Sequence, residues 1–239
     1  KDEINEITRQ LGYEDGLVNI GEMFHLWVIE GPQYLSEKLP FHKLGLNVKW
    51  VEDINPYRSI KVRILNGAHT STVPAAFLYG LDTVEQMSKD ELLGSFLRDI
   101  VYNEIIPSLG YDNEQLVSFA DSVMERFENP LIKHYLTSIL LNSSSKYKSR
   151  VLPSLLEYIN KYRKIPKKLS FSLAALIALY RNGKVKDSVL ELSRCDKVFF
   201  IRDDEKALDF FINLWNEYDE TEESIDNIVK KVLSNTCLW

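Results

Sequence analysis

The stretch Lys61-Val-Arg-Ile-Leu-Asn-Gly-Ala-His-Thr70 combines the apolar pattern of a buried helix with three side chains that can bind or exchange protons. At about 100° per residue, a helix places Lys61 at 0°, His69 at roughly 80° and Asn66 at roughly 140°. All three side chains then fall on one side of the helix. A glycine inside a helix costs about 1 kcal/mol relative to alanine, so we expect a compensating close contact at Gly67.

These three side chains allow two interpretations. Lysine, asparagine and histidine on one helix usually form a solvated face. The flanks are mostly apolar, however, as in Val73-Pro-Ala-Ala-Phe77, and this is typical of a buried helix. A buried lysine has a lowered pKa because desolvation disfavours its charge, which makes it a usable general base near neutral pH. The spacing alone leaves a solvated face and a catalytic site both open.

Further motifs accompany this stretch in a fixed order along the chain. They are Phe24-His-Leu-Trp-Val-Ile-Glu30, Pro74-Ala-Ala76, Arg126-Phe-Glu-Asn-Pro130, Asn142-Ser-Ser-Ser-Lys146 and Arg150-Val-Leu-Pro-Ser154. Together with the Lys-x4-Asn-x2-His spacing they resemble the long-chain mannitol dehydrogenase family, polyol and sugar-acid oxidoreductases that use nicotinamide and no metal. The run Phe171-Ser-Leu-Ala-Ala-Leu-Ile-Ala-Leu-Tyr180 is most similar to the hexuronate branch of that family, the tagaturonate reductases (altronate oxidoreductases). The resemblance extends from about residue 21 to residue 215.

The resemblance implies a role for each matched residue. Lys61 would be the general acid/base that takes the proton of the reacting hydroxyl and returns it to the alkoxide in the reverse direction. Asn66 would donate to the carbonyl or alkoxide oxygen, as an oxyanion hole does. His69 would anchor a neighbouring substrate oxygen, keep Lys61 in place and, when protonated, help to depress the pKa of that lysine. Lys146 would hold the far end of the substrate.

One departure from the family pattern concerns the substrate. Sugar-alcohol members carry an arginine eight residues before the matched lysine, where this chain has Ser138. A hexuronate has a carboxylate that needs a cation. The candidates nearest in sequence are Lys146, Lys148, Arg150 and Arg63; we favour Lys146 and then Arg150, and the spacing does not decide between them.

The function implied is the NAD-dependent interconversion of tagaturonate and altronate. A fructuronate reductase or a mannitol-type polyol dehydrogenase of the same family is an alternative. A non-catalytic helical interaction domain, in which Lys61 and His69 merely satisfy each other, is an alternative of another class. An upstream strand, glycine-rich turn and helix in the parent gene would favour the enzyme over the interaction domain.

The part that binds the dinucleotide is expected to lie outside this chain. The ten glycines form no Gly-x-Gly-x-x-Gly motif after an apolar strand. The resemblance covers only the C-terminal domain of the family, so the N-terminal dinucleotide-binding domain is the expected partner, together with a small sugar-acid substrate. The chain starts Lys-Asp-Glu-Ile-Asn, which is neither an initiator methionine nor a signal peptide. We therefore expect a piece of a longer protein.

Composition argues against several other classes. The net charge is −6 without a basic cluster interleaved with aromatics, so nucleic acid is not an expected partner. No apolar run reaches the roughly 20 residues that span a bilayer. Cys195 and Cys237 are too few for a disulfide scaffold, which favours a reducing cytoplasm. No metal is expected, because no histidine has the cysteine or histidine companions of a zinc site; the histidines are His25, His42, His69 and His134.

The periodicity predicts a mainly α single domain over residues 1–239, with a helical core over residues 60–239. The family resemblance implies a multi-helix bundle like the C-terminal domains of mannitol and 6-phosphogluconate dehydrogenases. Residues 1–59 are expected to form a connecting segment, with strands at 24–29 and 48–51 that pair as a hairpin or extend a sheet of the absent domain. His25 and Glu30 in this segment form a possible acid/base pair, although structural roles are favoured. Helices are expected over residues 2–11, 60–67, 75–79, 88–106, 114–127, 131–142, 147–163, 169–180, 205–218 and 221–234, with Ser88 and Glu91 as a capping box.

Overall fold

The computed structural model describes residues 2–18, 24–181, 183–194, 196–221, 224–235 and 238. The chain divides into two compact units, Lys1–Tyr57 and Arg58–Trp239, and each is described by itself. Cys195 and Cys237, the two cysteines considered above, lie outside the described residues. None of the helices within the described ranges is long and apolar enough to cross a membrane.

The first unit contains a small parallel sheet. Its elements are α1 (Asp2–Leu11), β1 (Trp27–Glu30), α2 (Leu35–Lys38), the 3₁₀ turn η1 (Phe41–Leu44) and β2 (Val48–Val51). Trp27 lies opposite Val48 in a parallel register, so the expected hairpin is wrong. The physical reason is the connection: α2 and η1 carry the chain back to the starting end of β1, as a parallel pair requires.

His25 and Glu30 both have structural roles in this unit. His25 Nε2 accepts a hydrogen bond from the backbone N–H of Asn47 at 2.9 Å. The Glu30 carboxylate accepts one from the backbone N–H of Ile54 at 2.9 Å. Each side chain therefore fixes a backbone segment, and the structural interpretation is the one that these contacts support.

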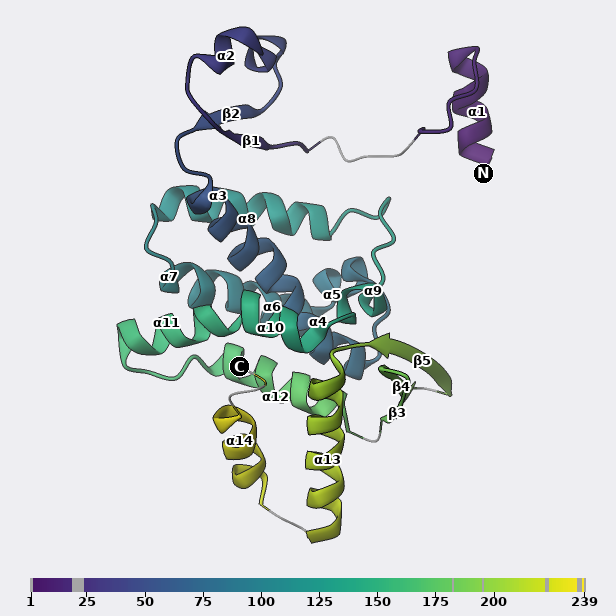
Figure 1. Cartoon of the computed structure of the whole chain (residues 1–239), viewed down its shortest axis with the longest axis vertical. Coiled ribbons are helices and arrows are strands. Elements are labelled where there is room, and N and C mark those ends of the chain that lie inside the picture. The colour runs from purple at the N-terminus through teal and green to yellow at the C-terminus, as the bar shows by residue number, and fades with distance from the viewer. Residues whose placement is uncertain are drawn as a thin grey trace. The chain divides into compact units, whose positions relative to one another are not determined.

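The second unit is predominantly helical. Figure 1 shows α4 surrounded by other helices of this unit, and it packs against α6, α9, α10 and α12. The elements are η2 (Lys61–Asn66), α4 (Gly67–Tyr79), α5 (Val84–Lys89), α6 (Glu91–Arg98), η3 (Asp99–Ile105), α7 (Ile106–Ser108), α8 (Asn113–Phe127), α9 (Leu136–Leu140), α10 (Ser143–Arg150), α11 (Leu152–Tyr162), α12 (Lys167–Leu179), β3 (Lys184–Lys186), β4 (Val189–Arg194), β5 (Lys197–Arg202), α13 (Glu205–Thr221) and α14 (Ile225–Ser234); α3 (Asn55–Ile60) spans the boundary between the units.

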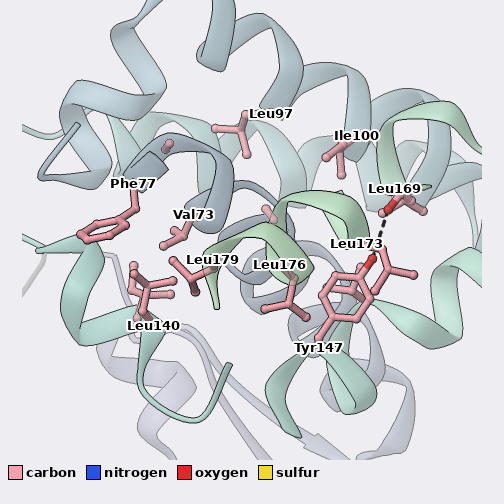
Figure 2. Packing of buried hydrophobic residues seen from close by; sticks show 14 of the residues in the cluster. Val73, Phe77, Leu97, Ile100, Leu140, Tyr147, Leu169, Leu173, Leu176 and Leu179 are labelled. Atoms are coloured by element: carbon pink, nitrogen blue, oxygen red, sulfur yellow. Dashed lines mark hydrogen bonds between the residues drawn. The ribbon is translucent and has the colours of Figure 1, made fainter. Parts of the chain in front are cut away.

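Helix α12 lies in the core of this unit, as its almost uniformly apolar sequence predicts. Figure 2 shows Leu173, Leu176 and Leu179 of α12 in the cluster that also contains Val73 of α4. The buried Tyr147 of α10 packs in the same cluster, and its hydroxyl donates to the backbone carbonyl of Leu169 at 3.1 Å. Because α4 and α10 both pack into this core, the residues that they carry are held on a rigid support.

Several helix ends differ from the sequence prediction. Ser88 is not a cap: it is buried at the end of α5, where its hydroxyl contacts the carbonyls of Glu85 and Phe127. Thr83 and Gln86 instead form the capping box of α5, and Asp90 caps α6. The helix expected over residues 131–142 is only α9, and that expected over 147–163 is divided at Val151, so that Pro153 falls in the first turn of α11.

An antiparallel meander occupies the interval between the helices predicted over residues 169–180 and 205–218, where the sequence analysis predicts no strand. The strands β3, β4 and β5 pair in order, with Val189 opposite Arg202. Alternate residues Leu190 and Leu192 are buried, which is the period-two pattern that the sequence analysis overlooked. Arg194 ties the sheet to α4, because its guanidinium donates to the carbonyl of Phe77 at 2.8 Å.

Candidate active site

A π-helical turn brings the first two candidate residues onto one side. Lys61–Asn66 form the π-helix η2, in which the backbone N–H of Gly67 bonds to the carbonyl of Val62. Bonds of this i→i+5 kind place residue 66 about one turn above residue 61. The separation of roughly 140° expected from α-helical geometry is therefore wrong, and Asn66 stands closer to Lys61 around the axis. Irregular turns of this kind recur at functional sites.

Gly67 lets helix α10 approach the start of α4. A Cβ at this position would lie 3.1 Å from the carbonyl oxygen of Arg150 and 3.7 Å from the Ile105 side chain. The close contact expected to compensate for the glycine is therefore present. Its consequence is that α10, which carries Lys146 and Arg150, packs directly against the turn between Asn66 and His69.

His69 is held neutral by its surroundings. Its ring stacks on Phe127 at 4.1 Å and meets the edge of His134 at 5.2 Å. Burial lowers the pKa of His69 to about 3, and the positive charges of His134, Arg126, Arg150 and Lys146 add to that effect. The Nε2 atom is buried without a hydrogen-bond partner. The expected influence of a protonated His69 on Lys61 is therefore wrong, since the ring carries no charge near neutral pH.

The neighbouring cations Lys61 and Arg63 lie in opposite environments. Lys61 is exposed, so its expected burial is wrong, and within the described residues its ammonium group makes no hydrogen bond or ion pair. Arg63 is buried and bonded to Glu157 at 2.7 Å and to the hydroxyl of Ser154 at 2.6 Å. Arg63 thus has a structural role, while the Lys61 amine has no protein partner within the described residues.

Two half-buried cations on α10, Lys146 and Arg150, lie close enough to His69 for their charges to lower its pKa. The Lys146 ammonium donates to the carbonyl of Ile139 at 2.8 Å, and burial, with the charge of Arg150, lowers its pKa. Burial also lowers the pKa of Arg150. The Arg150 guanidinium forms no hydrogen bond or ion pair within the part of the chain that the structure describes. A partly desolvated guanidinium without an acidic partner is an unusual arrangement.

Arg126 and His134 join this cluster of cationic or protonatable groups, and the sequence analysis did not select either of them. Both lower the pKa of His69 through their charge, which places them near its ring. Arg126 stands near the end of α8, and His134 stands before α9. Only the packing of these two segments against α4 brings the residues together. The Arg126-Phe-Glu-Asn-Pro130 motif was the only signal in the sequence that could have indicated one of them.

A buried carboxylate fixes the start of α10. Asp203 accepts hydrogen bonds from the Ser144 hydroxyl at 2.6 Å, the Ser144 backbone N–H at 3.1 Å and the Tyr180 hydroxyl at 2.6 Å. Burial, together with the nearby Asp203 carboxylate, raises the pKa of Tyr180. The network therefore keeps the tyrosine hydroxyl protonated as a donor and anchors the helix that carries Lys146 and Arg150.

Gly31, the glycine that directly follows β1, does not form an open phosphate cradle. Gly31 follows β1, but a Cβ there would meet the rings and side chains of Trp50 at 3.5 Å and Leu35 at 3.7 Å, in ordinary packing. This leaves no bare backbone cradle at the end of that strand. Across the same described ranges, no group of three or more His, Cys, Asp or Glu side chains could hold a metal ion.

The lowered pKa of His69 predicts a specific acid sensitivity. In the unfolded chain a histidine binds a proton near pH 6.5, whereas folded His69 does so only near pH 3, so acidification favours unfolding. Between pH 6.5 and 4.5, the wild type should lose about 2 kcal/mol more unfolding free energy than His69→Gln. Urea unfolding at both pH values measures this difference. Equal losses in the two proteins would show that folded His69 titrates normally.

Comparison with known proteins connects these residues to one family. Residues 53–239 match the model of the mannitol dehydrogenase C-terminal domain. The chain is 41% identical over 239 residues to altronate oxidoreductase of Yersinia enterocolitica and 42% identical over 238 residues to that of Bacillus subtilis. These alignments include all of this chain but 47% and 45% of the two relatives, so the chain spans about half the length of the curated relatives that it matches.

Two solved structures share the fold. The ternary complex of Pseudomonas fluorescens mannitol 2-dehydrogenase with NAD and D-mannitol superimposes with a TM-score of 0.69 at 20% identity, covering 98% of this chain and 43% of that one. Substrate-free D-sorbitol dehydrogenase gives a TM-score of 0.63 at 23% identity, covering 74% of this chain and 36% of that one. The mainly α fold expected from the sequence is thereby confirmed.

Proposed function

The chain belongs to the mannitol dehydrogenase C-terminal domain family, and on that premise we propose that it is the substrate-binding and proton-transferring part of a hexuronate oxidoreductase. The reaction proposed is the interconversion of tagaturonate and altronate with NAD. Support for the substrate class comes from two relatives named altronate oxidoreductase, each more than 40% identical to this chain. Each relative is about twice as long as the chain, and we assign the dinucleotide-binding domain to the remainder of the parent protein.

The observation that carries the proposal is the unpaired guanidinium of Arg150. Charges that proteins bury in part are normally paired, and Arg150 has no acidic partner within the described ranges. The carboxylate of a sugar acid would supply that partner through charge-assisted, bidentate hydrogen bonds. Lys146, four residues earlier on the same helix, adds a second donor to the same anion. A neutral polyol would leave the Arg150 guanidinium without an acidic partner, whereas Lys146 is also influenced by the charge of Asp203.

Residues of η2 and α4 have separate roles in the proposed proton transfer. The exposed Lys61 amine takes the proton of the reacting hydroxyl on oxidation and returns it to the alkoxide on reduction. The Asn66 amide donates a hydrogen bond to the same oxygen as its negative charge develops. Neutral His69 binds an adjacent substrate hydroxyl through Nε2, the buried atom that lacks a partner. We assign dinucleotide binding, and with it the supply of the hydride, to the rest of the parent protein.

The test compares substrates with and without a carboxylate in the full-length parent protein. Reduction of tagaturonate, fructuronate and fructose by NADH should favour tagaturonate. Arg150→Gln and Lys146→Gln should each lower kcat/KM for the uronates about 10- to 100-fold, as expected for loss of a charge-assisted hydrogen bond. Fructose, which has no carboxylate, should lose much less. Lys148→Gln removes an exposed charge from the same helix and serves as the matched control.

Each possible result has a clear meaning. Equal losses with fructose and tagaturonate would show that the two cations do not bind the carboxylate. A wild type that prefers fructuronate or fructose would make the protein a fructuronate reductase or a mannitol-type dehydrogenase instead. A wild type that reduces none of the three would contradict the enzyme and favour a helical binding module.

A further inference from the structure

The beginning of α4 contains buried polar atoms without partners. Asn66 Oδ1, His69 Nε2 and the hydroxyls of Thr70 and Thr72 are all buried and make no hydrogen bond. The first two belong to residues with proposed roles in proton transfer and substrate binding. The hydroxyl of Thr70 has no role so far, although its residue is only 4% exposed. Buried hydroxyls without a partner are uncommon in folded proteins and call for an explanation.

Helical geometry places Thr70 over Asn66. Asn66 has helical backbone angles (φ −75°, ψ −32°) and immediately precedes α4, so α-helical spacing applies from it onward. Thr70 follows by four residues and lies about 40° away around the axis. Helical side chains lean toward the N-terminus, so the Thr70 side chain covers the turn that contains Asn66. The two residues therefore lie on one face of the helix, one turn apart, although their buried polar atoms are not hydrogen-bonded to each other in this structure.

The hydroxyl of the neighbouring Ser71 makes the hydrogen bond that is usual inside a helix. Threonine and serine inside a helix commonly donate to a carbonyl three or four residues earlier. Ser71 does so, with its hydroxyl 3.2 Å from the carbonyl of Ala68. Thr70 makes no such bond, so its hydrogen is uncommitted. Asn66 Oδ1 is likewise an acceptor without a donor.

We propose that Thr70 is a positioning residue: its hydroxyl, which is unbonded in this structure, turns to donate to Asn66 Oδ1 when substrate binds and so directs the Asn66 amide N–H groups toward the reacting oxygen. A carboxamide has its oxygen and nitrogen on opposite sides, so holding the oxygen fixes where the two N–H groups point. Without this contact the amide can flip and present its oxygen to a developing alkoxide. The inference rests on the proposed function, because it assigns Thr70 a task in the same reaction.

Thr70→Val tests the proposal, since valine keeps the shape of threonine and removes the hydroxyl. In the full-length parent protein, with tagaturonate and NADH, kcat should fall about tenfold while KM changes by less than about twofold, because the lost contact acts in the transition state. Thr70→Ser keeps the hydroxyl and should retain most of the activity. Asn66→Ala should make Thr70→Val silent, because a residue that acts through Asn66 has no effect without it.

Thr72 provides the matched control. Its hydroxyl is also buried and unpartnered, but it lies about 120° from Asn66 around the helix, beyond the reach of that amide. Thr72→Val should therefore leave kcat unchanged. Equal losses from both valine variants, or a Thr70→Val effect on Tm alone, would overturn the proposal and indicate a packing role. If the wild type reduces no hexuronate, the proposed function itself fails before any variant is compared, and the role of Thr70 in that reaction fails with it.

Discussion

Lys61→Ala is expected to lower the turnover of the full-length parent protein by about three decades or more with tagaturonate and NADH. Removing a general acid/base costs about 10²- to 10⁴-fold, and the ammonium also stabilises the developing negative charge. Cofactor affinity should stay unchanged, because we assign dinucleotide binding to the remainder of the parent protein. Steady-state kinetics and NADH titration measure the two quantities separately.

An exposed lysine elsewhere gives the control for this result. Lys89 pairs with Glu85 at 2.7 Å across one turn of α5, and Lys89→Ala should keep full activity. Added methylamine should restore part of the rate of Lys61→Ala, because a free amine can carry the missing proton. A Lys61→Ala protein as fast as the wild type would show that the proposed proton transfer is wrong.

Asp203→Ala is expected to destabilise the fold by about 3 kcal/mol or more. The Asp203 carboxylate is 6% exposed and accepts four hydrogen bonds, from the hydroxyl and backbone N–H of Ser144, the Tyr180 hydroxyl and the Asp204 backbone N–H at 2.8 Å. Removing it leaves the Ser144 and Tyr180 donors buried without an acceptor, and each such group carries a desolvation penalty. Urea unfolding of the full-length protein, followed by tryptophan fluorescence, measures the change.

Asp209→Ala is the matched control, because Asp209 lies on an exposed position of the following helix α13. Its loss should alter the unfolding free energy by no more than about 0.5 kcal/mol. Tyr180→Phe should fall between the two variants, since it removes one donor and leaves the carboxylate its other three. Equal stability of Asp203→Ala and Asp209→Ala would mean that the network does not anchor α10.

The sequence predicts most helices of the second unit, because helical periodicity and apolar content are local properties. The apolar run that became α12 is an example, and its buried central position follows from its composition alone. The meander β3–β5 was missed for the opposite reason: its strands are short and partly exposed, and polar residues interrupt the alternation of Leu190 and Leu192. The parallel pairing of β1 and β2 depends on a crossover that no local pattern reveals.

The candidate site could be predicted only in part. Lys61, Asn66 and His69 share a motif and were selected together, but the π turn that aligns the first two has no known local signal in this sequence. The low pKa of His69 comes first from its burial and then from the charges of Arg126, His134 and α10, and all of these depend on segments from distant parts of the chain. The prediction that Lys61 is buried was wrong, because apolar neighbours on a helix do not decide which side a single long side chain faces.

The π turn makes the site depend on a count of residues as well as on their identities. In η2, one turn contains an extra residue relative to an α-helix, and this surplus lies between Lys61 and Asn66. If the turn relaxed to α-helical form with all its residues kept, Lys61 would lie about 140° from Asn66 around the axis and would leave its side. Deleting one residue between them together with that relaxation would leave four residue steps, or about 40°, and would keep the two side chains on one side. The alignment of Lys61 with Asn66 therefore depends on the match between the number of residues in this turn and its hydrogen-bond pattern.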